Sequence, residues 1–238
     1  MSSFVLIITF AFGVVIGEEK NSTRKYNARA KLILEGLKLK GDVKIGKIIY
    51  LELCLACHLP AANGDPSGAF PQVAGQHSTV GIKQMADIWA GNRDNPTMFP
   101  FANYDAIEEA SEDLLDEERS GVQVIADMAA YIQSVPMTSS VIGEGKDLAN
   151  GKKLFEATCT KCHGDHGQGS FKNHYPVLTG QNYNYLVRQF KMIKDGKRRN
   201  ANPEMVKIIN DFKEKDIKAI MDFLSRQKMR KGDWDPNK

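Results

Sequence analysis

This sequence is poor in the features that would place it in several common classes. Its 238 residues include four cysteines, and because all four lie in two C-x-x-C-H segments, none is left for a structural disulfide. The formal net charge is only +3, which does not indicate a nucleic-acid-binding surface. The apolar run at residues 4–17 has 14 residues, fewer than the about 20 that a membrane-spanning helix needs. The composition leaves a globular protein whose cysteines serve a purpose other than cross-linking.

The charge that is present is unevenly distributed. Residues 1–143 contain 12 Lys and Arg against 17 Asp and Glu, a net charge of −5, whereas residues 144–238 contain 20 against 12, a net charge of +8. Such a dipole suits oriented docking to charged protein partners better than binding to nucleic acid.

The two C-x-x-C-H segments are the strongest signal in the chain. They are Cys54-Leu55-Ala56-Cys57-His58 and Cys159-Thr160-Lys161-Cys162-His163. This pattern is the signature of covalent c-type haem attachment, because two thiols three residues apart lie on one side of a helical turn and can both add to one edge of a porphyrin. His58 and His163 are then the candidate proximal iron ligands, with a neutral imidazole nitrogen as the donor.

A single C-x-x-C-H segment could also be half of a zinc site or a thioredoxin-like redox pair, and an internal repeat decides between these interpretations. An offset of 105 residues relates the two motifs and, without a gap, their flanks: Asp42 to Asp147, Gly46 to Gly151, Tyr50 to Phe155, Pro71 to Pro176, Gln76 to Gln181 and Arg93 to Arg198. Zinc ribbons need their two Cys pairs within about 15 to 20 residues of each other, and a redox pair has no use for a His after both copies. The repeat therefore predicts two domains that each bind one haem c.

The N-terminal residues are predicted to be an export signal. Residues 4–17 have the length of a signal h-region, and Val15-Ile16-Gly17 offers a small-residue cleavage site. Because residues 1–3 lack the usual positive charge, an uncleaved anchor is the alternative, and only then do we expect membrane association. The predicted divisions are a signal peptide (1–17), a basic leader (18–41), a first domain (42–134), a linker (135–144) and a second domain with a C-terminal tail (145–238).

Helices are predicted at matching places in the two domains. In the leader, Ala30, Leu34 and Leu37 lie at helical spacing, so we expect a short helix that packs loosely on the first domain, a docking or membrane-surface helix being the alternative. Asp42 and Asp147 are the expected N-caps of the helices that lead into the haem motifs. Further helices are expected at 79–90, 120–134, 183–195 and 215–227.

The combined pattern resembles a class I cytochrome c domain. Each copy carries a Gly and an aromatic residue before C-x-x-C-H, then aromatic-Pro-x-x-x-Gly-Gln at 70–76 or 175–181, a helix, Gly-x-Arg and a Met-bearing loop. Two such domains in tandem resemble the dihaem cytochromes c4 and the similar dihaem subunit of flavocytochrome c sulfide dehydrogenase, over about residues 42–228. The resemblance implies an all-α fold of two domains, each wrapped round one covalently bound haem with His and Met axial ligands, and a role in one-electron transfer.

The sixth iron ligand is sought among the Met residues. The segment N-P-x-M occurs at residues 95–98 and again at 202–205, at an offset of 107. A thioether is a soft donor suited to haem iron, and Met ligation raises the reduction potential. A single Met usually fills a gap in a core, but Met98 and Met205 recur within the N-P-x-M segments of the two copies, whereas at the offset of 105 no Met aligns with another Met. Met98 and Met205 are therefore the predicted ligands.

Further roles follow from the resemblance. Pro71 and Pro176 match the proline whose carbonyl typically accepts a hydrogen bond from the proximal His and so fixes the imidazole orientation. Arg93 and Arg198 are candidates to bind haem propionates, since guanidinium groups prefer carboxylates; a plain exposed Arg is the alternative at each position.

The remaining histidines do not repeat. His77, His166 and His174 align with no His in the other copy, so we expect them at the surface or in loops. If one haem had two His ligands, His166 and His174 would be the first candidates.

Two charged segments suggest docking surfaces. Before its final helix the first domain has 15 extra residues, which carry an acidic insert at 105–118: Asp105, Glu108, Glu109, Glu112, Asp113, Asp116, Glu117 and Glu118. A basic cluster lies at 191–199: Lys191, Lys194, Lys197, Arg198 and Arg199. Such blocks are usually solvated faces, but both are candidate docking sites for charged redox partners, with contacts that salt would weaken.

The sequence thus predicts an exported dihaem cytochrome of the periplasm or an equivalent compartment, which carries electrons between redox partners, as in a respiratory chain, and is not an enzyme. Two alternatives remain. The same domains could form the electron-accepting subunit of an oxidoreductase complex. A dihaem peroxidase-type enzyme is disfavoured, because it needs an open iron position and both copies offer a Met.

Overall fold

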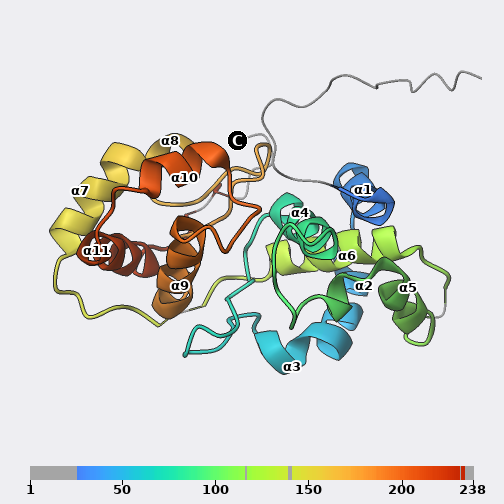
Figure 1. The fold of residues 1–238 in the computed structure, drawn as a ribbon. Helices are drawn as coiled ribbons and strands as arrows, with labels where there is room; N and C mark the ends of the chain where they lie inside the picture. Colours follow the sequence, from blue (N-terminus) through green and yellow to red (C-terminus); the bar gives the residue numbers. More distant parts are fainter. Residues whose placement is uncertain (1–25, 116, 139–140, 231, 234–238) are drawn as a thin grey trace, which may run out of the picture.

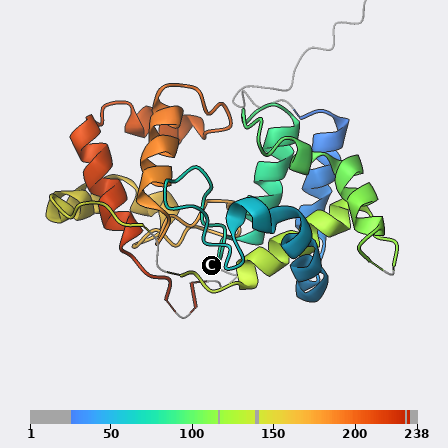
Figure 2. The same cartoon turned by 90° about the horizontal axis from the view of Figure 1, so that it is seen from below.

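The computed structural model describes residues 26–115, 117–138, 141–230 and 232–233. These residues form two helical units that lie side by side (Figures 1 and 2), and within the described ranges there is no β-strand. The predicted all-α fold is confirmed. The segment 1–17, predicted to be a signal peptide, lies outside the described residues.

The first unit runs from α1 to α6 and the second from α7 to α11. The first contains α1 (Ala28–Glu35), α2 (Val43–Ile49), α3 (Leu55–His58), α4 (Ser78–Trp89), α5 (Tyr104–Glu112) and α6 (Gly121–Ser134), with two 3₁₀ helices, η1 (Gly36–Lys38) and η3 (Pro100–Ala102), and a π-helical segment, η2 (Tyr50–Cys54), that continues α2. The second contains α7 (Leu148–Thr158), α8 (Thr160–His163), α9 (Tyr183–Lys194), α10 (Pro203–Ile209) and α11 (Glu214–Ser225). The four helices predicted after the haem motifs are confirmed, with small shifts at their ends.

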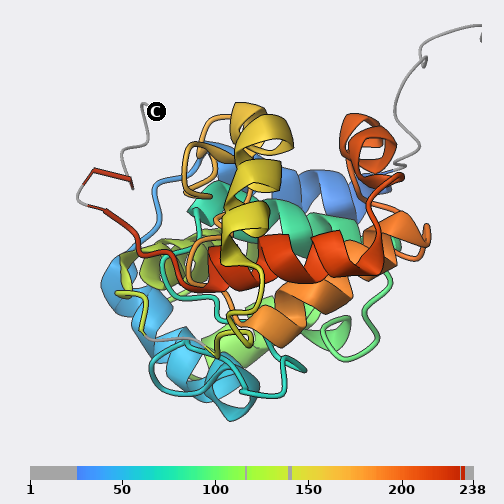
Figure 3. The same ribbon diagram turned by 90° about the vertical axis from the view of Figure 1, so that its left-hand side faces the viewer.

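A helix crossing at a glycine is common to both units. α2 packs on α6, and α7 packs on α11, as Figure 3 shows for the second unit. A Cβ added at Gly46 would collide with the carbonyl oxygen of Asp127 in α6, and one added at Gly151 with that of Ala219 in α11. Both helices can approach this closely only because glycine has no side chain. The Gly46–Gly151 pair of the repeat marks these crossings.

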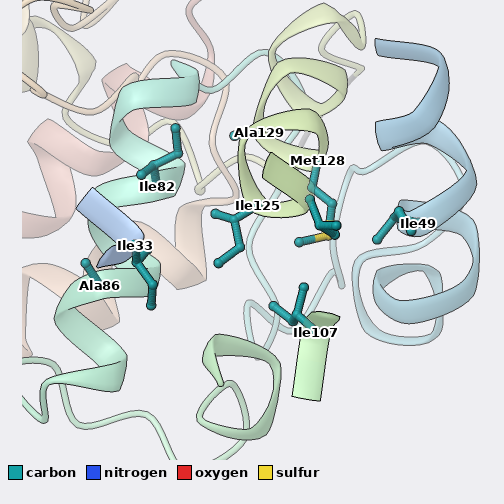
Figure 4. Close-up of a cluster of buried hydrophobic side chains, with 9 residues drawn as sticks. Ile33, Ile49, Ile82, Ala86, Ile107, Ile125, Met128 and Ala129 are labelled. Carbon is teal, nitrogen blue, oxygen red and sulfur yellow. The ribbon is translucent and has the colours of Figure 1, made fainter. Parts of the chain in front are cut away.

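Each unit has an apolar core of its own. In the first unit the buried side chains come from α1, α2, α4, α5 and α6 (Figure 4). They are Ile33, Ile49, Ile82, Ala86, Ile107, Val124, Ile125, Met128 and Ala129. The core of the second unit is built on Phe155, Phe190 and Leu224. Tyr50 and Phe155, which match in the repeat, are both completely buried.

The leader helix is part of the first unit. α1 carries Ile33, which is completely buried in the core, and Ala30 is also completely buried. The hydroxyl of Tyr26 donates to Oδ1 of Asp87 in α4 at 2.7 Å. The predicted helix is confirmed, but the expectation that it packs loosely is wrong, because its apolar face completes the core.

The two predicted N-caps behave differently. The side chain of Asp42 accepts from the backbone N–H groups of Lys44 and Ile45, at 2.7 and 3.2 Å, as predicted. Asp147 occupies the same position before α7 but caps no backbone N–H; its Oδ2 accepts from Nδ2 of Asn150 at 3.0 Å. The predicted N-cap position of Asp147 is confirmed, whereas the expected bond from its side chain to a backbone N–H is absent.

The segment predicted as a linker contacts both units. The backbone N–H of Thr138 donates to Oε1 of Gln72 at 3.1 Å, and that of Val141 donates to Oδ1 of Asn182 at 3.1 Å. The linker is therefore held in the junction between the units.

The helix crossing yields a first prediction. Gly46→Ala should lower the free energy of unfolding by about 1–3 kcal/mol, because α2 and α6 must separate to admit a methyl group. Gly81→Ala is the matched control: its added Cβ would meet nothing closer than Cβ of Ala129 at 3.7 Å, and it lies inside α4. There the exchange should stabilise by about 0.5–1 kcal/mol. Denaturant unfolding of the haem-loaded protein measures both, and equal effects of the two variants would contradict the crossing.

Candidate haem-binding sites

The two C-x-x-C-H segments have the same backbone course. In each, the long helix ends at the first Cys, where φ and ψ are −112° and −27° at Cys54 and −108° and −27° at Cys159. A four-residue helix then holds the second Cys and the His: α3 carries Cys57 and His58, and α8 carries Cys162 and His163. The local break therefore repeats with the sequence.

Each candidate ligand histidine is held by a proline carbonyl. Nδ1 of His58 lies 3.0 Å from the carbonyl oxygen of Pro71, and Nδ1 of His163 lies 3.3 Å from that of Pro176. Because a carbonyl oxygen only accepts, Nδ1 must donate, which leaves Nε2 with a free lone pair. Both rings are buried, and burial lowers the pKa of each imidazole below its usual value. Each is thus a neutral nitrogen donor with a fixed orientation.

The four thiols are free and partly buried. Burial, followed by the neighbouring Cys57, raises the pKa of Cys54 to about 12, and burial raises the pKa of Cys159. A dithiol redox centre needs a lowered pKa to form its thiolate, so these pairs do not suit thiol–disulfide exchange. Within the described residues no cluster of three or more His, Cys, Asp or Glu could hold a metal ion.

The two predicted Met ligands lie in different local structures. Met98 is partly buried and lies in a turn, where its own backbone N–H donates to the carbonyl of Asn95 at 3.1 Å. Met205 is partly buried in α10, where it packs against the second core. The expectation of a Met-bearing loop is met in the first unit, whereas in the second Asn202 caps a helix through the backbone N–H of Glu204 at 2.8 Å.

Arg93 and Arg198 meet in the junction between the units. Oε1 of Gln84 accepts from Nη1 of Arg93 at 2.9 Å and from Nη2 of Arg198 at 3.2 Å. Oε1 of Gln189 accepts from Nη1 of Arg198 at 2.9 Å and from Nη2 of Arg93 at 3.4 Å. Gln84 and Gln189 are themselves related by the offset of 105. The four side chains therefore form a pseudo-twofold cluster that joins the units.

This cluster has more positive than negative charge. Among the described residues neither guanidinium forms an ion pair with a carboxylate, and their partners are amides and the Tyr185 hydroxyl. Burial and, after it, the charge of Arg93 lower the pKa of Arg198 to about 10. Two neighbouring cations with neutral partners suit an anionic ligand.

Two glutamines clamp the units together in the same symmetric way. Gln181 accepts from the backbone N–H of Gln72 at 2.9 Å and donates to its carbonyl at 2.6 Å. Gln76 accepts from the backbone N–H of Val177 at 2.9 Å and donates to its carbonyl at 3.2 Å. The sequence comparison pairs Gln76 with Gln181 but assigns them no role; the signal for a shared contact was a polar residue that recurs in both copies without being needed for haem attachment.

The unrepeated histidines are less exposed than predicted. His77 and His166 lie in loops, as one of the two predicted settings has it, but they are not at the surface, because they are only 2 % and 5 % exposed. Nε2 of His166 bonds Oδ2 of Asp233 at 2.8 Å, and Nε2 of His77 lies 2.9 Å from the carbonyl oxygen of Gln168 in the second unit. His174 lies in a loop, partly buried. These rings join the C-terminal tail and the first unit to the second haem loop.

The two charged segments differ in how far their charges are already paired. In the acidic insert, Glu109, Glu112, Asp113 and Glu118 are exposed. In the basic cluster, Lys191 pairs with Glu214 at 3.0 Å, Lys194 donates to the carbonyl of Phe212, and Arg199 donates to that of Gly91 at 2.7 Å. Arg198 lies in the junction. The acidic insert thus offers the freer charges.

The residues present fit a haem group in each unit. Two thiols, a bare imidazole nitrogen and a partly buried Met are the donor types of c-type attachment and iron ligation, and each unit supplies all of them. A cavity of about 290 Å³ adjoins Cys162, Gly164 and Tyr175 in the second unit.

Of the helices in the described part of the chain, none is long and apolar enough to cross a membrane.

Comparison with known proteins gives a consistent result. Residues 43–136 match the family described as "Cytochrome c", and residues 146–224 match "Cytochrome C oxidase, cbb3-type, subunit III". Cytochrome c4 of Azotobacter vinelandii is 32% identical over 72% of this chain and 83% of its own length. A "Thiosulfate dehydrogenase electron acceptor" of Stutzerimonas stutzeri is 28% identical over 72% of this chain and 77% of its own length. The crystal structure of reduced recombinant cytochrome c4 from Pseudomonas stutzeri superposes with a TM-score of 0.64 at 26% identity, covering 79% of this chain and 99% of that one.

The buried His77 gives a pH-dependent prediction. Because Nε2 must donate to the Gln168 carbonyl, protonation would place a second N–H on Nδ1, which has no partner in the described structure. Burial lowers the pKa of His77 below 6.5, against the opposing effects of the Gln168 carbonyl and Asp233. A lowered pKa means that the folded state binds the proton less well, so its contribution to stability is complete above pH 6.5 and is lost as the pH falls through the folded value.

We expect His77→Asn to remove the loss of folding stability that protonation of His77 causes at low pH. Asn182, which matches His77 in the repeat, makes the corresponding bond with an amide that does not titrate, donating to the carbonyl of Asn63 at 3.2 Å. Thermal unfolding midpoints between about pH 7.5 and about pH 5 span the ordinary histidine pKa. The wild-type midpoint should fall more steeply than that of His77→Asn, whereas Asn182→Ala should keep the steep fall. Parallel curves for the wild type and His77→Asn would contradict the assignment.

Proposed function

Because this chain belongs to the cytochrome c4 family, it is an electron-transfer protein with two covalently bound haem c groups, and we propose which residues hold them. Cys54 and Cys57 attach one haem, and Cys159 and Cys162 attach the other. A bound haem c supplies an iron that gains and loses one electron. The two proposed haem domains are 42–134 and 145–238, joined by the linker at 135–144; the separate cores of the two units support this division.

Nε2 of His58 and of His163 are the proposed proximal iron ligands, and the two His–Pro bonds carry this proposal. In each unit the proline carbonyl takes up Nδ1 and leaves one imidazole nitrogen unshared. Met98 and Met205 are the proposed sixth ligands, supported by their recurrence in the repeat and by their partial burial. A protected His/Met site changes little between the two iron states, which favours fast transfer.

Arg93 and Arg198 are proposed to bind haem propionates in the junction. Their positive charges lie side by side with neutral partners, and carboxylates would neutralise them. Electrons would then pass from one haem domain to the other through the junction that the Arg–Gln cluster closes.

The Met assignments are tested by the sulfur-to-iron charge-transfer band in the near infrared. Met98→Ala and Met205→Ala should each remove about half of the band, since each removes one thioether ligand. Met128→Leu is the control: Met128 is buried and its Sδ lies 4.0 Å from Sγ of Cys54, yet it aligns with Ile220. It should leave the band intact. A full band in either Ala variant would refute that ligand.

The acidic insert is proposed as the docking surface for a basic redox partner. Its carboxylates at Glu109, Glu112 and Asp113 are exposed, whereas the basic cluster is largely paired within the protein. Exposed charge mainly sets the association rate, which salt then lowers. The basic cluster at 191–199 would contribute chiefly through Lys197.

Reduction of the oxidised protein by the cationic complex hexaammineruthenium(II) tests this surface. Replacing Glu109 and Glu112 with Gln and Asp113 with Asn should slow the second-order rate and flatten its dependence on salt. Lys197→Gln should raise the rate or leave it unchanged. Identical rates and salt dependence in the wild type and the acidic variant would rule out the insert.

Export to the periplasm or an equivalent compartment, by a signal at residues 1–17, is also proposed, as is a role within a respiratory chain.

The second candidate function is that of electron-accepting subunit in an oxidoreductase complex, supported by the similarity to a thiosulfate dehydrogenase electron acceptor. Purification at low salt distinguishes the two. A free carrier elutes alone, whereas a subunit elutes with a catalytic chain whose substrate reduces the haems.

A further inference from the structure

One peptide unit in the junction has hydrogen-bond partners from both halves of the molecule. The carbonyl of Pro71 and the N–H of Gln72 belong to the same peptide unit. The carbonyl accepts from Nδ1 of His58 at 3.0 Å, and the N–H donates to Oε1 of Gln181 at 2.9 Å. A side chain of the second unit is therefore connected, through a single peptide, to the candidate iron ligand of the first.

The same arrangement occurs in reverse. The carbonyl of Pro176 accepts from Nδ1 of His163 at 3.3 Å, and the N–H of Val177 donates to Oε1 of Gln76 at 2.9 Å. Each glutamine also donates Nε2 to the carbonyl of the residue that it clamps. Because that pair of bonds requires the oxygen on one side and the NH₂ on the other, the amide orientation is fixed.

Hydrogen bonds in such a chain polarise one another. When the N–H of a peptide is bonded to an acceptor, its carbonyl oxygen becomes a stronger acceptor. A stronger acceptor at Nδ1–H makes the imidazole a more basic ligand, and a more basic ligand favours the oxidised iron. The low exposure of Gln72 and Gln181, at 2 % and 5 %, keeps water from replacing these bonds.

We propose that Gln181 and Gln76 are positioning residues that lower the reduction potential of the haem in the opposite unit. The proposal rests on the proposed function, in which His58 and His163 bind iron. Gln181 acts on the haem of His58, and Gln76 acts on the haem of His163. The effect of Gln181 is the larger, because the His58–Pro71 bond is the shorter of the two.

The test is a redox titration of the haem-loaded protein in which each haem is followed by its own axial-Met methyl resonance. Gln181→Leu should raise the midpoint potential of the haem in the first unit and leave the other unchanged. Gln76→Leu should do the reverse, with a smaller shift. The Nδ1–H resonance of the affected histidine should move with the potential, a change that a loss of packing alone would not confine to one haem.

Gln72→Ala is the matched control. It removes the bonds that the Gln72 side chain makes to the Gly180 carbonyl at 2.6 Å and to the Thr138 N–H at 3.1 Å, but it leaves the Gln72 N–H on Gln181. It weakens the junction, and both potentials should stay in place. Equal shifts of both haems in Gln181→Leu, no shift, or the same shift in Gln72→Ala would each overturn the proposal. Failure of the proposed function is distinct, because the unmutated protein would then lack two Met methyl resonances.

Discussion

Gln76 and Gln181 each bond both the N–H and the carbonyl of one residue in the opposite unit, and these reciprocal bonds join the two units. The segments that they clamp also hold the candidate ligand histidines, through Pro71 and Pro176. The haem sites and the junction are therefore built from the same short stretches of chain. A change in how the units dock must reach both histidines, and a change at either histidine must reach the junction.

The side-chain contacts in the junction repeat at the offset that relates the two copies of the sequence, whereas a neighbouring buried carboxylate has no counterpart in the second copy. The Arg–Gln cluster and the two glutamine clamps obey the offset of 105. Asp87 does not, because Met192 occupies its place in the second copy. This buried carboxylate accepts from Tyr26 of the leader at 2.7 Å and from Asn200 of the second unit at 2.9 Å. The leader, the first unit and the second unit therefore meet at one carboxylate, paired with Lys83, that only one copy possesses.

The fold and the site were predictable from sequence to different degrees. Repetition and helical spacing predicted the two units, the helices after each motif and the Asp42 cap, because these depend on local pattern. Burial of α1 and the burial of His77 and His166 depend on contacts between distant segments, which local pattern does not encode. The junction was predictable only in part. Gln84 and Gln189 match at the repeat offset of 105 residues, but the sequence does not show that the folded chain brings them together with both arginines.

The most direct test of the account is the distance between the two irons in the oxidised protein, measured by pulsed dipolar electron paramagnetic resonance. Two haems held by a fixed pseudo-twofold junction predict a single narrow distribution of distances that does not change with protein concentration. Its width should increase when Gln76 and Gln181 are both replaced with Ala. A broad distribution in the unmutated protein, or one unaffected by that double replacement, would contradict the claim that these clamps fix the two haem domains against each other.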